Sequence, residues 1–225
     1  MSLSSSRENF CLPGRDKFKT NYLMKLIYSL SLVCLALLFA GSPVKKGYEV
    51  GDTAIDFKLK NVDGKMISLA DYKEAKGYIV IFDCNTCPYS KAYNDRIVAL
   101  SKKYSKDFPL IAINSNSSEE SSGDSFEDMV KYAKKNGYNF PYLIDETQEI
   151  ARAYGATNTP HVFILNKTKS DLKVAYIGTI DDNARNASSV TKRFVEDAVD
   201  ALLAGKPITT SKTKAIGCGI KWKDA

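Results

Sequence analysis

The sequence predicts an α/β fold in which helices cover both faces of a central β-sheet of mixed direction. Three observations support this prediction. Two continuous apolar runs rich in β-branched and aromatic residues, 78–83 and 110–114, have the composition of strands buried on both faces. Between them, residues 88–104 carry apolar side chains at spacings of three and four, as an amphipathic helix does. Two further strand-like segments, 161–166 and 173–178, follow one another directly, so the sheet is expected to turn antiparallel at its end.

The remaining elements complete the alternation of strands and helices. An antiparallel hairpin is expected at the start, where residues 56–60 and 65–69 flank Asp63-Gly64, a strong signal for a tight turn. A loop rich in Ser, Glu and Gly follows the second buried strand and is expected to be exposed, and the helix after it should end at Asn136-Gly137. In chain order the other predicted segments are the loop 115–124, the strand 141–145, the short helix 148–154 and the final helix 187–204.

The chain divides into four predicted regions. Residues 24–42 combine a lysine, an apolar run and small residues, which is the layout of a secretory signal peptide. The apolar run is shorter than the ~20 residues of a membrane span, so cleavage and release outside the cytoplasm are favoured over a permanent anchor. Residues 1–23 form a polar extension that precedes a second start at Met24. The folded domain is predicted at 47–206, followed by a tail at 207–225.

Composition narrows the class of function. The chain is 44% apolar and 26% charged, which suits one ordinary soluble core. Its formal net charge is +6, and half of that excess belongs to the first 42 residues. Because the rest is spread without a Lys/Arg cluster, nucleic-acid binding through counterion release is not expected, and membrane contact is expected only through residues 24–42.

The cysteines carry the strongest chemical signal. Of five, Cys84, Cys87 and Cys218 lie outside the leader. Cys84 and Cys87 stand two residues apart where a buried strand meets a helix, and the unpaired N–H groups of a helix N-terminus favour a thiolate, the form that attacks disulfides. We predict a redox pair in which Cys84, at the exposed junction, attacks and Cys87, pointing inward, resolves the mixed disulfide. No metal or other cofactor is required.

Other interpretations of the cysteine pair are open. A closed zinc site needs four N or S ligands, and beyond the pair only Cys218 and His161 are available, without paired spacing. A purely structural disulfide is harder to exclude, although so small a ring removes little chain entropy. The two residues can also simply pack in the core.

Five further residues are considered for the same site. Asp83 directly precedes Cys84, so its carboxylate can accept a proton or tune the thiol pKa, or it can turn into solvent at the strand end. Cys218 lies between two glycines and can be a third redox cysteine, or a free or intermolecularly bonded thiol in a docked tail. Thr159-Pro160 precedes a buried strand, where a proline marks either a constrained entry or a plain loop. A lone histidine such as His161 is more often a packing residue than a catalyst.

The order of strand, Cys-x-x-Cys, helix and Thr-Pro before a strand resembles that of thioredoxin. The stretches VGDTAIDFKLKNVDGK, CNTCPYSKAY, TNTPHVFIL, YIGTIDDN and GCGIKWK further resemble the peroxiredoxin-like branch of that superfamily, the alkyl hydroperoxide reductase and thiol-specific antioxidant group, over most of residues 49–223. This resemblance implies a thioredoxin-like fold, thiol-disulfide oxidoreductase activity, and a cis-Pro160 loop opposite the cysteines, where Thr159 offers its backbone to an extended peptide. The Pro-x-x-x-Thr-x-x-Cys pocket of true peroxiredoxins is not matched, because Cys84 stands at its threonine.

The leading functional hypothesis is therefore an exported thiol-disulfide oxidoreductase. Its partners would be a protein disulfide or a small thiol or peroxide substrate, and a thiol electron donor. A thiol peroxidase is the first alternative, which consumption of peroxide would reveal. The second is a non-catalytic thioredoxin-fold binding protein, whose disulfide would resist mild reductant.

Overall fold

The structure, a computed structural model, describes residues 47–223. The polar extension and the predicted signal segment at 24–42 lie outside the described residues. Within the described part of the chain, no helix is both long and apolar enough to cross a membrane.

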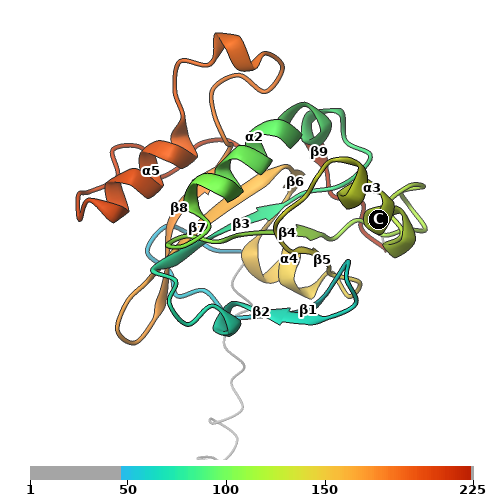
Figure 1. Cartoon of the computed structure of the whole chain (residues 1–225), viewed down its shortest axis with the longest axis horizontal. Helices are drawn as coiled ribbons and strands as arrows, with labels where there is room; N and C mark the ends of the chain where they lie inside the picture. Colours follow the sequence, from blue (N-terminus) through green and yellow to red (C-terminus); the bar gives the residue numbers. More distant parts are fainter. Residues whose placement is uncertain (1–46, 224–225) are drawn as a thin grey trace, which may run out of the picture. The chain divides into compact units, whose positions relative to one another are not determined.

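A seven-stranded mixed sheet forms the centre of the domain, as predicted (Figure 1). Its strand order is β2-β1-β5-β4-β3-β7-β8. The three central strands β3, β4 and β5 are parallel, whereas β1 joins β5, and β7 joins β3, in antiparallel fashion. The strands are β1 (Lys58–Asn61), β2 (Met66–Ser68), β3 (Gly77–Phe82), β4 (Leu110–Asn114), β5 (Tyr142–Ile144), β7 (His161–Lys167) and β8 (Leu172–Gly178).

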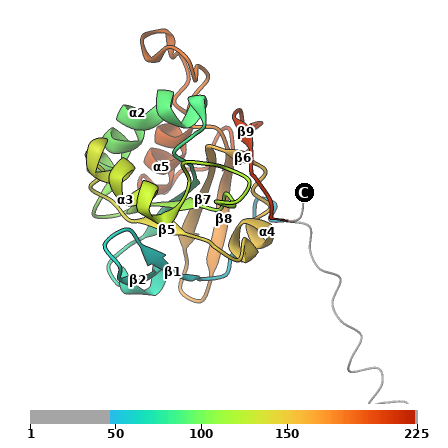
Figure 2. The same cartoon turned by 90° about the vertical axis from the view of Figure 1, so that its right-hand side faces the viewer.

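Helices cover both faces of this sheet (Figure 2). One face carries α2 (Pro88–Tyr104), α3 (Phe126–Lys135) and α5 (Phe194–Leu203), and the other carries α4 (Glu149–Tyr154). Two short 3₁₀ turns, η1 (Leu69–Asp71) and η2 (Ala187–Ser189), lie in connections.

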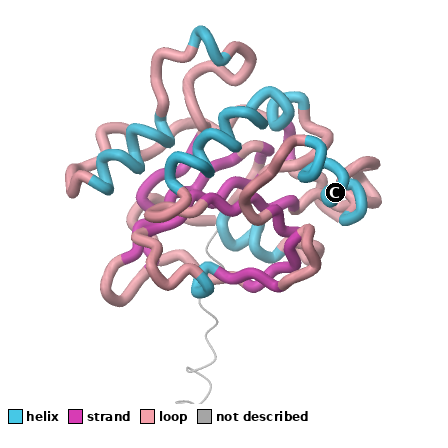
Figure 3. Tube along the Cα trace, viewed as in Figure 1, coloured by secondary structure: helices cyan, strands magenta, loops and turns pink. Residues whose placement is uncertain are grey.

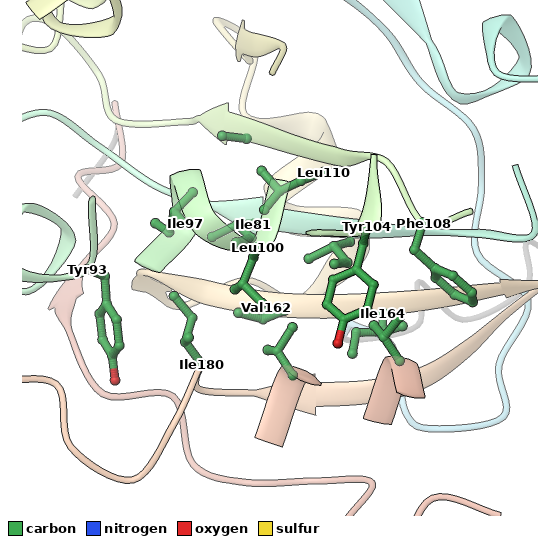
Figure 4. Close-up of a cluster of buried hydrophobic side chains, with 14 of the residues drawn as sticks. Ile81, Tyr93, Ile97, Leu100, Tyr104, Phe108, Leu110, Val162, Ile164 and Ile180 are labelled. Atoms are coloured by element: carbon green, nitrogen blue, oxygen red, sulfur yellow. The ribbon is translucent and has the colours of Figure 1, made fainter. Parts of the chain in front are cut away.

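The core divides into two layers because side chains alternate along the strands. On β3, Ile79 and Ile81 face the α2 side, whereas Val80 and Phe82 face the α4 side, and all four are fully buried. Figure 4 shows the first layer, in which α2 packs Ile97 and Leu100, among others, onto the strands. This packing fixes α2, and hence its N-terminus, against the sheet.

Two expectations for connecting segments are wrong. The final helix does not begin at residue 187: a single 3₁₀ turn is followed by extended chain, and α5 starts at Phe194 (Figure 3). The Asp182 carboxylate accepts hydrogen bonds from the backbone and hydroxyl of Thr191, which holds this chain away from a helix. The loop 115–124 is also less exposed than predicted, since Ser115, Ser117 and Asp124 are buried.

The C-terminal tail is docked on the domain. A two-residue strand, β9 (Cys218–Gly219), pairs antiparallel with β6 (Asn158–Thr159), and it lies beside the start of α2 (Figure 1). Trp222 packs on the α4-side layer, with the guanidinium of Arg152 4.4 Å from its ring. This small second sheet was not predicted from the sequence.

Candidate active site

The junction between β3 and α2 positions the cysteine pair. β3 ends at Phe82 and α2 begins at Pro88, so the four residues of the motif lie in the turn between them. Pro88 takes the first helical position, where its missing N–H is not needed. Cys87 is consequently the N-cap residue of α2, with its sulfur near the helix N-terminus.

Both sulfurs of the pair lie against Thr159. Sγ of Cys84 is 3.1 Å from the Thr159 hydroxyl, and Sγ of Cys87 is 3.1 Å from the Thr159 carbonyl oxygen. The Thr159–Pro160 peptide is cis. The structure therefore brings together four of the residues predicted from sequence. The exposure predicted for Cys84 is wrong, because only 1% of its surface is accessible, against 2% for Cys87.

Cys218 completes a group of three thiols. Its Sγ lies 2.7 Å from Sγ of Cys87, and its backbone N–H donates to the same sulfur at 3.4 Å. All three cysteines are free thiols, and Cys218 is the one that is partly exposed. Cys87 is thus the middle sulfur, with Cys84 on one side and Cys218 on the other.

Electrostatics makes Cys87 the most acidic of the three thiols. As a neutral thiol, Cys87 donates to the Thr159 carbonyl oxygen and to Cys218 Sγ. Its interaction with the Cys84 thiol first, and then with the Cys218 thiol and the backbone N–H groups of Ser90 and Cys218, lowers the pKa of Cys87 to about 4 despite its burial. The pKa of the Cys84 thiol is raised, first by its interaction with Cys87 and then by burial and the nearby Asp83 carboxylate. Burial, together with its hydrogen bond to Cys87, raises the pKa of Cys218 to about 11. The electrostatics therefore favour Cys87 as the thiolate, which differs from the order of attack predicted from sequence.

Asp83 is completely buried, so the prediction that it can turn into solvent is wrong. Burial raises the pKa of its carboxyl group to about 6. The Tyr138 hydroxyl lies 3.4 Å from Oδ2 of Asp83 but only 2.9 Å from Asn94 Oδ1, so its single hydrogen favours Asn94. Oδ1 of Asp83 and Oγ of Ser90 have no hydrogen-bond partner among the described residues.

Asp124 holds the two middle residues of the motif. Its carboxylate accepts from the backbone N–H of Asn85 at 2.7 Å and from the hydroxyl of Thr86 at 2.7 Å. The amides of Asn114 and Asn116 also donate to it, and only 1% of Asp124 is exposed. Sequence analysis missed this residue because it sits at the end of a polar loop that looked solvated.

His161 is a structural residue of β7. Its ring is largely buried, its Nδ1 accepts a hydrogen bond from the backbone of Thr157 at 3.3 Å, and it packs on Phe163. Burial lowers the pKa of His161 to about 4, so the ring is neutral at physiological pH. Between residues 47 and 223, no three His, Cys, Asp or Glu side chains are grouped in a way that could hold a metal ion.

Comparison with known proteins agrees with this fold. The thiol-disulfide oxidoreductase ResA of Geobacillus thermodenitrificans is 26% identical over 159 residues, which are 69% of this chain and 84% of that protein. Among solved structures, an uncharacterized conserved protein of Geobacillus kaustophilus is 41% identical, with a TM-score of 0.73, covering 79% of this chain and 94% of its own. A hypothetical protein of Sinorhizobium meliloti is 32% identical, with a TM-score of 0.73, and the match covers 80% of this chain and 97% of that protein. The sequence profile of the AhpC/TSA family matches residues 50–176, and the chain belongs to this family.

Proposed function

We propose that this chain is an exported thiol-disulfide oxidoreductase that passes two electrons from its cysteine pair to a substrate disulfide. The observation that carries the proposal is the pair of neighbouring free thiols, Cys84 and Cys87, at the start of α2 against the Thr159–Pro160 edge. The ResA relatives, which are thiol-disulfide oxidoreductases by name, support the same activity. The apolar segment at 24–42 supports export.

The reaction needs only the thiols. The Cys87 thiolate attacks one sulfur of the substrate disulfide, and the other substrate sulfur leaves as a thiolate, which takes a proton from water. Cys84 then attacks Cys87 Sγ in the mixed disulfide, which closes the Cys84–Cys87 disulfide and releases the second substrate thiol. Two thiol equivalents from an electron donor, itself oxidised to a disulfide, return the pair to the reduced state.

The surroundings of the motif suit a thiol or peptide substrate. A surface hollow of about 340 Å³ lies beside Asn85 and Thr86, with Lys91 and Lys131 on its wall. On the other side, Thr159 has the constrained backbone at which an extended peptide can pair. Its described partner there is the tail residue Cys218, so a peptide would compete with the tail for this edge.

The test is catalysis of disulfide reduction in a model protein, with dithiothreitol as donor. The wild type should accelerate the reaction, and Cys87→Ser should abolish the acceleration because the attacking sulfur is lost. With Cys84 and Cys218 both replaced by Ser, a mixed disulfide between substrate and Cys87 should accumulate. A wild-type pair that remains oxidised at strongly reducing poise would instead indicate a structural disulfide and a non-catalytic binding protein.

Thiol peroxidase activity is the second candidate, favoured by the lowered pKa of Cys87 and by the two thiols beside it. Peroxide would convert the Cys87 thiolate to a sulfenic acid. A neighbouring thiol would then condense with this sulfenic acid, forming a disulfide and releasing water. Consumption of hydrogen peroxide in the presence of dithiothreitol, lost in Cys87→Ser, would support this activity over the first.

A further inference from the structure

The last described residues of the chain are built into the cysteine site. Residues 217–223, here called the docked tail, run from the Thr159 edge across the ends of β4 and α4. Backbone hydrogen bonds join Ile220 to Thr157 and Lys221 to Ser117, at 3.1 and 2.8 Å. Ile220 is buried with the α4-side core layer. The tail is therefore a fixed part of the domain.

The side chain of Gln148 holds this tail in place through hydrogen bonds. Its side-chain amide donates to the carbonyl oxygens of Ser115 and Lys221, at 2.6 and 2.8 Å, and its Oε1 accepts from the backbone N–H of Lys223 at 3.0 Å. Gln148 is 2% exposed and has a left-handed backbone with a φ of 60°. Such a backbone is uncommon for a residue other than glycine, and here it accompanies a side chain whose polar atoms are all used on the tail and its neighbouring loop.

Gly217 allows the tail to approach the cysteines closely. A Cβ atom at this position would lie 2.1 Å from the Thr159 carbonyl oxygen, which the backbone could not accommodate without moving. At Gly219, on the other side of Cys218, the nearest atom to such a Cβ would be the Thr157 oxygen at 4.0 Å. The requirement for glycine is thus specific to the side of Cys218 that touches Thr159.

The result of this docking is a thiol held against the central sulfur of the site. Cys218 Sγ is 2.7 Å from Cys87 Sγ, longer than the ~2 Å of an S–S bond, so the two free thiols are in contact without being bonded. Cys84 and Cys87 are 1% and 2% exposed, whereas Cys218 is partly exposed. An external thiol would therefore meet Cys218 before either residue of the pair.

From this geometry we infer that Cys218 is a third catalytic thiol, which exchanges with the Cys84–Cys87 disulfide to form a Cys87–Cys218 disulfide. The Cys218 sulfur attacks Cys87 Sγ, the Cys84–Cys87 bond breaks, and Cys84 leaves as a thiol that takes up the proton of Cys218. No electrons are gained or lost in this step. The inference rests on the proposed function, since it gives the oxidised enzyme a second form whose partly exposed sulfur an external thiol donor can reduce.

Disulfide mapping tests this step directly. The full chain, with Cys11 and Cys34 replaced by Ser, would be equilibrated with oxidised and reduced glutathione, quenched with acid, alkylated, digested and analysed by mass spectrometry. The chain that keeps all three site cysteines should contain both the Cys84–Cys87 and the Cys87–Cys218 linkages. In Cys84→Ser, the Cys87–Cys218 linkage should be the internal disulfide that forms. Finding only glutathione adducts or free thiols in Cys84→Ser would overturn the inference.

Failure of the proposed function would look different. In Cys218→Ser the Cys84–Cys87 disulfide should still form reversibly; if it did not, the proposed function would fail irrespective of the tail. The matched glycines separate docking from general flexibility in the Cys84→Ser background. Gly217→Ala should slow formation of Cys87–Cys218 by about 10- to 100-fold, whereas Gly219→Ala should leave it nearly unchanged. Equal rates for the two variants would contradict a role for the docked tail.

Discussion

At the scale of single residues, the three thiols differ in charge because they differ in hydrogen bonding. Interaction with Cys84, and then with Cys218 and backbone N–H groups, lowers the pKa of Cys87, whereas Cys84 is buried beside Asp83 and its pKa is raised. In a chain with Cys11 and Cys34 replaced by Ser, we therefore expect one thiolate at pH 7, with a pKa near 4. Ultraviolet absorbance of the thiolate, followed from pH 3 to pH 9, measures it.

Single replacements assign this thiolate to a residue. Cys87→Ser should remove the absorbance at pH 7. Cys84→Ala should keep a thiolate but raise its pKa, because the strongest hydrogen bond to Cys87 is lost. The opposite pattern, in which Cys84→Ala removes the thiolate, would restore the order of attack that the Cys-x-x-Cys pattern predicts.

Ionisation of the buried Asp83 carboxyl group lowers the free energy of unfolding. Its pKa rises from 3.8 to about 6, so the native state holds its proton more tightly than the unfolded chain does. Stability is then greatest below about pH 4 and falls as pH rises through 6, by about 3 kcal/mol for a shift of this size. Asp83→Asn should accordingly raise the free energy of unfolding at pH 7 by up to ~3 kcal/mol, with little effect at pH 4.

Asp181→Asn is the matched control for Asp83→Asn. Asp181 is also buried, but it bonds to Arg96 at 2.6 Å and to the Tyr93 hydroxyl at 3.0 Å. Its replacement should destabilise the domain by about 1 to 3 kcal/mol at pH 7. Urea unfolding at pH 4 and pH 7 measures both effects, and a loss of stability in Asp83→Asn at pH 7 would show that its carboxylate is better solvated than the structure indicates.

At the scale of elements, the segments with strong local patterns were predicted closely. The helix over 88–104 and the strand over 110–114 have the predicted bounds because periodicity, a proline at the helix start and continuous apolar runs are local signals. The segment 187–193 was wrongly assigned to a helix, since its contact with Asp182 is a tertiary one. The pairing of β6 with β9 joins residues some 60 positions apart, and two-residue strands carry no pattern of their own.

The loop before α3 holds the turn of the Cys-x-x-Cys motif through the hydrogen bonds of Asp124. Asp124 → Asn would retain the size of the side chain but replace one of the oxygens that accept from Asn85, Thr86 and two asparagine amides. We expect the free energy of unfolding to fall by about 1.5 to 3 kcal/mol, because hydrogen bonds to a buried charge are among the stronger ones. Thermal or urea unfolding of the reduced protein measures this.

Asp128→Asn provides the control from the same region. The backbone N–H of Asp128 donates to Ser125, the N-cap of α3, and the Asp128 carboxylate accepts from the Ser125 hydroxyl and lies 3.9 Å from Lys131. It should change stability by less than about 1 kcal/mol. If the two variants lowered the free energy of unfolding equally, the loss would come from the start of α3, and the contacts of Asp124 with the motif would contribute little to stability.

At the scale of the domain, the sequence pattern indicated that the cysteines, Thr159 and Pro160 lie together, but not how deeply they are buried. Burial of Cys84 depends on how the motif turn, the Thr159 edge and the docked tail close over one another, and each of these comes from a different part of the chain. The same closure turns Cys218 from an ambiguous tail residue into a neighbour of Cys87. Such a contact, between residues 131 positions apart, leaves no periodicity in the sequence.

The reduction potential of the domain follows from how many oxidised forms it has. With Cys218 present, the oxidised protein is shared between the Cys84–Cys87 and Cys87–Cys218 disulfides, and each added form stabilises the oxidised state. Cys218→Ser removes one form while retaining a donor to Cys87, so the potential should become less negative. If the Cys87–Cys218 form is tenfold favoured, the rise is about 30 mV, since a tenfold change in a two-electron equilibrium corresponds to that value. Equilibration of wild type and Cys218→Ser with glutathione buffers measures the difference; a potential that stays the same or becomes more negative would mean that the second disulfide is not populated at equilibrium.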